Sequence, residues 1–219
     1  MFSLPFQTRR RFLKTAVAAA VLVAAPLAAI GGALAQTVPT AELMAPGPLP
    51  DMWMGKADAP VTVIEYASMT CPHCADFHKD TYPGLKSKYI DTGKVRFVLR
   101  EFPLDPLATA GFMLARCIGA DKRNAMIDLL FDQQKNWAFV DKPLEGLMNV
   151  VKQTGMTKEA FDACLKDQKL YNQVTQMRDI ASRKFDVKAT PTFFINGKKI
   201  EGEMSPAEMD QALAPFLKS

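Results

Sequence analysis

The sequence predicts an α/β fold in which a sheet is interrupted by a long helical segment. Two apolar, β-rich runs lie early in the chain, at residues 61–66 and 95–100, and a third follows at residues 192–195. Residues 106–185, between the second and third runs, show helical rather than strand periodicity. The chain has 219 residues, of which 48% are hydrophobic, and this is enough for one domain with its own core.

The first half of the predicted sheet leads into a short turn that contains two cysteines. Residues 61–66 (VTVIEY) are almost continuously apolar, which is typical of a strand buried in a sheet. The sequence Cys-Pro-His-Cys follows at residues 71–74, and a helical pattern runs from there to about residue 90. Pro72 suits the first turn of a helix, because the N–H that proline lacks would have no partner there. We therefore expect the cysteines at the start of a helix.

The chain returns to strand after the helical segment. Residues 192–195 are followed by Asn196-Gly197, a strong signal for a tight hairpin. We expect residues 198–200 to pair with residues 192–195. Ser-Pro-Ala-Glu at residues 205–208 combines an N-cap, a proline at the first helical position and a capping-box acid, so a final helix begins there. Breaks within the helical segment are expected near residues 119–121, 141–143 and 155.

The net charge of +4 comes from the first 35 residues alone. That segment holds 4 of the 27 basic side chains and none of the 23 acidic ones. The rest of the chain therefore lacks the basic excess of a nucleic-acid-binding protein.

The same segment has the pattern of an export signal. Three arginines at residues 9–11 precede a small, apolar run that closes with Ala-Leu-Ala at residues 33–35. The arginines resemble the twin-arginine export motif. A run of this length suits a membrane span as well, but Pro26 and the following glycine pair favour a signal. We expect cleavage after Ala35 and a periplasmic protein.

The Cys-Pro-His-Cys turn has the chemistry of a redox-active dithiol. Cysteines three positions apart on the first turn of a helix lie within bridging reach. The sulfur of Cys71 precedes the helix, where unpaired N–H groups and the macrodipole favour negative charge, so its pKa should be depressed. His73 adds a positive or hydrogen-bonding neighbour. A stabilised thiolate makes the disulfide a stronger oxidant, and Cys74 resolves mixed disulfides formed on Cys71.

Zinc binding and an inert structural bridge are the competing interpretations of this turn. Cys71, Cys74 and His78 would share a helix face, which favours zinc. The sequence has no second Cys-x-x-Cys and no distant histidine, so we favour redox chemistry and expect no metal. His78 itself is expected on the helix surface.

These features together resemble the thioredoxin superfamily: the strand, the Cys-Pro-His-Cys turn, and Ala-Thr-Pro-Thr at residues 189–192 before a hairpin. The Pro-His dipeptide and the long helical insertion are similar to its DsbA-like thiol:disulfide oxidoreductases. The resemblance covers about residues 51–219 and implies a thioredoxin fold with an inserted all-helical domain. The chain then divides into a signal peptide (1–35), an extended N-terminal arm (36–58), a thioredoxin-like domain (59–105 and 186–219) and a helical insertion (106–185).

The resemblance also implies roles for residues outside the turn. Pro191 would follow a cis bond and pack opposite the two cysteines, with the Thr190 backbone free to pair with an extended substrate. Glu65 would lie beneath the cysteines and assist proton transfer at Cys74. From the residues alone, an ordinary trans proline that ends the helical block is the favoured interpretation. The glutamate could also face water or pair with an arginine of the second strand.

Cys117 and Cys164 both fall in the helical segment, away from any histidine. In an exported protein we expect them to bridge two helices, and some DsbA-like proteins similarly carry a second, noncatalytic disulfide. Two buried free thiols are the alternative.

The implied function is a periplasmic oxidase that donates the Cys71–Cys74 disulfide to unfolded exported proteins with free cysteines. The resemblance implies reoxidation by a membrane quinone reductase of the DsbB type, without a cofactor, and we expect a monomer. A disulfide isomerase or reductase of the same fold is the alternative. Known isomerases have a separate N-terminal dimerisation domain, which residues 36–58 are too short to supply. A metal-binding or chaperone module is a further alternative, and its binding would survive Cys71→Ser.

Overall fold

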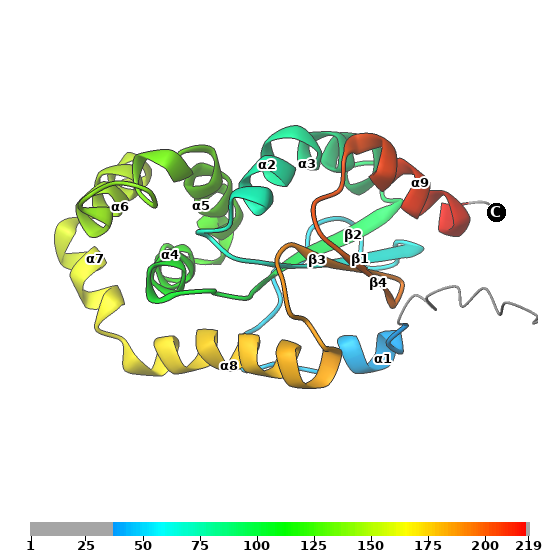
Figure 1. Cartoon of the computed structure of the whole chain (residues 1–219), viewed down its shortest axis with the longest axis horizontal. Helices are drawn as coiled ribbons and strands as arrows, with labels where there is room; N and C mark the ends of the chain where they lie inside the picture. The colour runs from blue at the N-terminus through cyan, green and yellow to red at the C-terminus, as the bar shows by residue number, and fades with distance from the viewer. Residues whose placement is uncertain (1–36, 218–219) are drawn as a thin grey trace, which may run out of the picture. The chain divides into compact units, whose positions relative to one another are not determined.

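A four-stranded sheet with the strand order β2-β1-β3-β4 lies at the centre of the fold (Figure 1). The computed structural model describes residues 37–217, so the predicted signal segment lies outside the described residues. The strands are β1 (Val61–Ala67), β2 (Val95–Glu101), β3 (Thr192–Ile195) and β4 (Lys198–Glu201). β1 and β2 are parallel, β3 is antiparallel to β1, and β4 closes the hairpin with β3. The predicted strands and hairpin are confirmed.

Every residue of β1 is buried, because helices cover both faces of the sheet. Successive side chains on a strand point to opposite faces. Ile64 and Tyr66 pack with Phe185 on one side, whereas Val63 packs with Phe77 on the other. Glu65 therefore belongs to the face that α2 covers, and this alternation brings it under the cysteine turn.

The helices follow the predicted order with more interruptions. They are α1 (Thr40–Leu43), α2 (Pro72–Asp80), α3 (Tyr82–Leu85), the π-helix η1 (Lys86–Ile90), α4 (Pro106–Cys117), α5 (Ala120–Asp132), the 3-10 turn η2 (Gln134–Asn136), α6 (Pro143–Val151), the 3-10 turn η3 (Lys152–Thr154), α7 (Lys158–Leu165), α8 (Gln168–Phe185) and α9 (Pro206–Leu217). The helical stretch expected up to about residue 90 is confirmed, but it is divided into α2, α3 and η1, because α2 ends at Asp80. Pro83 cannot donate the next backbone hydrogen bond, so a new helix starts there.

Local capping chemistry sets several helix ends as predicted. Ser205 N–H donates to Glu208 Oε2 (2.8 Å), and Glu208 N–H donates to Ser205 Oγ (3.4 Å), which completes the capping box of α9. Gly119, with φ of 101°, and Gly155, with φ of 86°, interrupt the helical segment at two of the predicted breaks. Both angles lie in a region that glycine adopts without steric cost.

The N-terminal arm is not extended throughout. It contains the short helix α1, whose Leu43 is buried against the sheet. Thr37 pairs with Lys198 and Met54 pairs with Phe97, so the arm adds bridges to β4 and β2. These contacts need residues far along the chain, which explains why the sequence pattern showed none of them.

Two connections tie the helices between β2 and β3 together. Cys117 at the end of α4 forms a disulfide with Cys164 of α7. Glu101 at the end of β2 is fully buried and accepts from Arg116 (2.8 Å) and Arg123 (2.7 Å). A buried carboxylate needs such partners, because an unpaired charge is costly in the interior. These contacts fix the helices against the strand that leads into them.

Candidate functional site

The two cysteines of the turn sit at the start of α2 as free thiols. Cys71 is the N-cap residue with an extended backbone, and Pro72 occupies the first helical position. Cys71 is 6% exposed and Cys74 is fully buried. The helix start therefore presents the first sulfur towards the surface and encloses the second.

The surroundings separate the acidities of the two thiols. A hydrogen bond from Cys74 lowers the pKa of Cys71 to about 6. Burial opposes this shift, whereas Thr190 and the backbone N–H groups of Cys74 and His73 support it. Burial raises the pKa of Cys74 well above its usual value, with further increases from its bond to Cys71 and from the charge of Glu65. At neutral pH the pair holds one thiolate, on Cys71, and one thiol, on Cys74.

The loop before β3 lies against the outer sulfur. The Thr190–Pro191 peptide bond is cis. When Cys71 is protonated, its Sγ donates to the carbonyl oxygen of Thr190 (3.2 Å). Gly202 N–H donates to the carbonyl oxygen of Pro191 (2.9 Å). The hairpin thus holds main-chain groups of this loop beside the reactive sulfur, although 119 residues separate it from Cys71.

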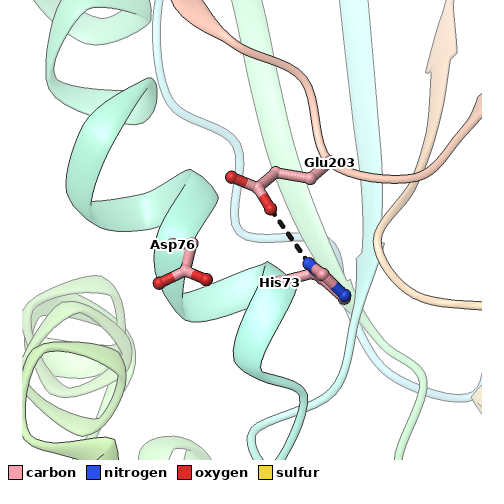
Figure 2. A group of neighbouring side chains, drawn as sticks. All are labelled: His73, Asp76 and Glu203. Atoms are coloured by element: carbon pink, nitrogen blue, oxygen red, sulfur yellow. Dashed lines mark hydrogen bonds and ion pairs between the residues drawn. The ribbon is translucent and has the colours of Figure 1, made fainter.

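His73 lies in the first turn of α2, and its side chain is exposed. Its Nδ1 lies 3.0 Å from Glu203 Oε2, and Asp76 follows one turn later on the same helix (Figure 2). The hydrogen bond with Glu203 raises the pKa of His73, and the charge of Cys71 adds to this effect. The three side chains offer ligand atoms within 4.8 Å of one another, but all are exposed, unlike the enclosed ligands of a structural zinc site. The charge of Cys71 thus acts on the His73 ring, whereas His73 acts on Cys71 through its backbone N–H.

Glu65 is fully buried and pairs with a residue that the sequence analysis placed elsewhere. Its Oε2 lies 2.9 Å from His78 Nε2. The arginine pairing considered for Glu65 is wrong, since Arg96 donates to Thr62 and Arg100 donates to Asp51.

The expected surface position of His78 is also wrong. Its side chain is only 5% exposed, because Cys74, Phe77 and His78 form the buried stripe of α2 at positions i, i+3 and i+4. Burial opposes the charged ring, but the carboxylates of Glu65 and Asp128 outweigh it and raise the pKa of His78 to about 9. The helical spacing from Cys74 was the signal that would have revealed this position.

Gln134 is a site residue that the sequence analysis missed. It is buried at the start of η2, and its Nε2 donates to the carbonyl oxygens of Met69 (2.8 Å) and Cys71 (3.0 Å). One side chain from the helical segment therefore satisfies two main-chain acceptors of the cysteine turn. No local pattern marks a glutamine for this task, because its partners lie more than sixty residues earlier.

A family model described as thioredoxin matches residues 49–214, which span the sheet, the cysteine turn and the intervening helices. The chain belongs to the thioredoxin family. The fold is the thioredoxin fold with a helical insertion between β2 and β3, as predicted. Among residues 37–217, no helix has the length and apolarity to cross a membrane.

Within the thioredoxin family, the chain is similar to DsbA proteins. The crystal structure of alpha-DsbA1 from Wolbachia pipientis is 30% identical, with a TM-score of 0.74 over 80% of this chain and 94% of that one. Oxidised BdbD from Bacillus subtilis is 25% identical, with a TM-score of 0.66 over 77% of this chain and 94% of that one.

Sequence relatives point to the same branch of the family. A Rickettsia bellii protein named as a candidate protein-disulfide oxidoreductase is 39% identical over 69% of this chain and 59% of its own length. Disulfide bond formation protein D of Bacillus subtilis is 28% identical over 75% of this chain and 76% of its own length. The chain thus spans about three fifths of the Rickettsia relative.

Proposed function

We propose that this protein is a periplasmic thiol:disulfide oxidase that donates the Cys71–Cys74 disulfide to exported proteins with free cysteines. One observation carries the proposal: a hydrogen bond from Cys74 lowers the pKa of Cys71 to about 6, whereas burial raises the pKa of Cys74. A stabilised Cys71 thiolate favours the reduced pair, and this makes the disulfide form a strong electron acceptor.

The reaction takes two thiol–disulfide exchanges. A substrate thiolate attacks Cys71 Sγ, the bond to Cys74 breaks, and the electron pair moves to Cys74, which takes up a proton. A second substrate thiolate then attacks the substrate sulfur of the mixed disulfide and releases Cys71 as a thiolate. The substrate gains a disulfide and the protein becomes a dithiol. The low pKa of Cys71 makes it a good leaving group in the second exchange.

We propose that substrates bind beside Cys71 as extended segments. The main chain of Thr190, next to the cis-Pro191 bond, would pair with the substrate backbone as an added strand. A cavity of about 440 Å³ adjoins the turn and is lined in part by Pro72, Ala75 and the exposed Phe139. Its other lining residues are mostly polar or charged, so the cavity offers both apolar and charged groups to a substrate segment: Asp76, Lys79, Phe131, Asp132, Gln134 and Lys135.

The reduced protein needs an electron acceptor to complete the cycle. The donor role leaves Cys71 and Cys74 as a dithiol, and it requires no other redox group that could take up their electrons. We propose that a membrane quinone reductase of the DsbB type accepts these electrons. The pair itself needs no metal or organic cofactor, and we propose that the protein acts as a monomer. We also propose that residues 1–35 direct export and that residues 106–185 form a domain inserted into the thioredoxin-like part.

The first test is the reduction potential of the Cys71–Cys74 couple, equilibrated in glutathione buffers. A value near about −120 mV would support the oxidase, whereas a value near about −270 mV would identify a reductant and refute the donor role. Two rates separate an oxidase from an isomerase. An oxidase should speed disulfide formation in a reduced client protein, whereas an isomerase should speed the rearrangement of wrong disulfides in a scrambled client.

A trapping experiment separates thiol exchange from a binding role. Cys74→Ser should accumulate clients as mixed disulfides on Cys71, and Cys71→Ser should abolish turnover. A metal-binding or chaperone module would instead keep its binding activity in Cys71→Ser and hold zinc when reduced. Absence of any adduct on Cys74→Ser with a reduced, unfolded client would contradict the exchange mechanism.

A further inference from the structure

His78 stands between the buried carboxylate of Glu65 and an open cavity. Its ring lies against Phe131, with centroids 4.4 Å apart and nearly parallel planes, and against Tyr82 at 4.9 Å. These contacts hold the imidazole in one orientation. Nε2 faces inward, 2.9 Å from Glu65 Oε2.

The other ring nitrogen faces the outside of the fold. Nδ1 is buried and has no hydrogen-bond partner among the described residues, and it lies 3.7 Å from Asp128 Oδ1. The Asp128 side chain is 54% exposed. Both residues line a cavity of about 360 Å³, whose other charged and titratable groups are Lys79, Tyr82, Lys86 and Asp132. The His78 ring therefore lies between the buried carboxylate of Glu65 and the solvent-exposed carboxylate of Asp128.

The buried acid at the inner end of this path acts electrostatically on the cysteine pair. Glu65 and Cys74 are both fully buried, and the charge of Glu65 acts on the Cys74 thiol. Glu65 Oε1 has no hydrogen-bond partner among residues 37–217. Cys74 leaves as a thiolate when the disulfide opens, so a proton has to reach an atom that water does not contact.

We propose that His78 passes the proton between Glu65 and the cavity, and so supplies Cys74 when the Cys71–Cys74 bond breaks. The imidazolium gives its Nε2 proton to the Glu65 carboxylate, and the carboxylic acid formed in this way gives a proton to the Cys74 thiolate. Reoxidation returns the proton by the same route to Nε2, and exchange with solvent takes place at Nδ1. The ring needs no rotation, which its stacking opposes. This role acts through Glu65 and rests on the proposed thiol–disulfide exchange.

The test follows the reduction of the Cys71–Cys74 disulfide by a small dithiol in single turnovers from pH 5 to pH 9. His78→Gln keeps an N–H donor for Glu65 but cannot pass a proton. We expect it to slow the reaction about 100-fold near neutral pH, at the lower end of what general acid–base catalysis contributes. The ratio to wild type should shrink at low pH, where solvent protons are plentiful. Asp80→Ala, an exposed position at the end of the same helix that lines neither cavity, should retain the wild-type rate.

Chemical rescue distinguishes proton transfer from a structural role. His78→Ala leaves space for a free imidazole, and added imidazole should restore its rate without accelerating wild type. Glu65→Gln should not respond to imidazole, because the inner carrier is missing. A folded His78→Gln that matches wild type at every pH would refute the proposal, as would His78→Ala that is slow and stays slow in imidazole.

Wild-type measurements keep the proposal testable if both variants unfold. The reduction step should slow in heavy water, and an unchanged rate there would refute proton transfer in that step. A wild-type disulfide that does not react with the dithiol at all would refute the proposed function instead. These two failures are therefore distinct.

Discussion

Removing the sulfur of Cys74 tests what lowers the pKa of Cys71. The hydrogen bond from Cys74 is the main cause of the shift to about 6, ahead of the backbone N–H groups at the helix start. A hydrogen bond to a charged group contributes about 1.5–3 kcal/mol, which corresponds to about one to two pKa units. Cys74→Ala should therefore raise the pKa of Cys71 to about 7–8.

Cys74→Ser is the matched control for this substitution. Its hydroxyl occupies the same place and can donate to the Cys71 thiolate, so the pKa of Cys71 should stay near 6. At pH 7 the thiolate fraction would be about 90% in Cys74→Ser and between about 10% and 50% in Cys74→Ala. The two variants differ in one donor atom, which isolates the hydrogen bond.

The assay is the pH dependence of Cys71 alkylation, checked against the ultraviolet absorbance of the thiolate. Each variant has a single free cysteine, because Cys117 and Cys164 form a disulfide. Equal titrations near pH 6 in both variants would refute the reasoning. The helix N-terminus and its N–H groups would then account for the acidity without Cys74.

Three further predictions concern stability, each measured by urea unfolding. Replacing Cys117 and Cys164 with alanine opens a 47-residue loop and should cost about 4 kcal/mol, whereas a change below about 1 kcal/mol would contradict the chain-entropy account. Gln134→Leu leaves two main-chain acceptors of the cysteine turn unpaired and should cost about 1–3 kcal/mol. Lys135→Leu, at the exposed neighbouring position, should be nearly neutral. Because the pKa of Cys71 is lower in the folded protein than in the unfolded chain, the thiolate stabilises the reduced fold. This stabilisation is complete when the pH exceeds the unfolded-state pKa, and it is lost as the pH falls through about 6. Reduced wild type should therefore gain at most about 1.4 kcal/mol over Cys71→Ser between pH 5 and pH 7, and a pH-independent difference would contradict the shift.

Local patterns predicted the elements whose causes are local. The continuous apolar run of β1, the Asn-Gly hairpin and the capping box of α9 each depend on residues within a few positions of one another. The Cys-Pro-His-Cys turn belongs to this group, since the proline and the helix start are adjacent. Periodicity predicted the helical stretch up to about residue 90 but not its division near Pro83, where the backbone lacks an N–H donor.

Residues whose position depends on distant segments were missed or misplaced. His78 was expected on the surface, because a histidine on a short helix has no local sign of its partner on β1. Gln134 and Glu203 carry no motif, yet one holds the cysteine turn and the other contacts His73. Their importance comes from what the fold places beside them.

By itself, the sequence determined the chemistry of this protein: a dithiol at a helix start, a hairpin preceded by a proline, and a helical segment between the halves of a sheet. Helix capping and strand periodicity act over a few residues, so these features can be recognised without the fold. Only the tertiary structure decided which groups surround the sulfurs. The Thr190 carbonyl and the amide of Gln134 meet Cys71 across separations of 119 and 63 residues, and Glu65 meets His78 across 13. Burial and pairing are properties of groups brought together by packing, and packing sets the acidity of each thiol.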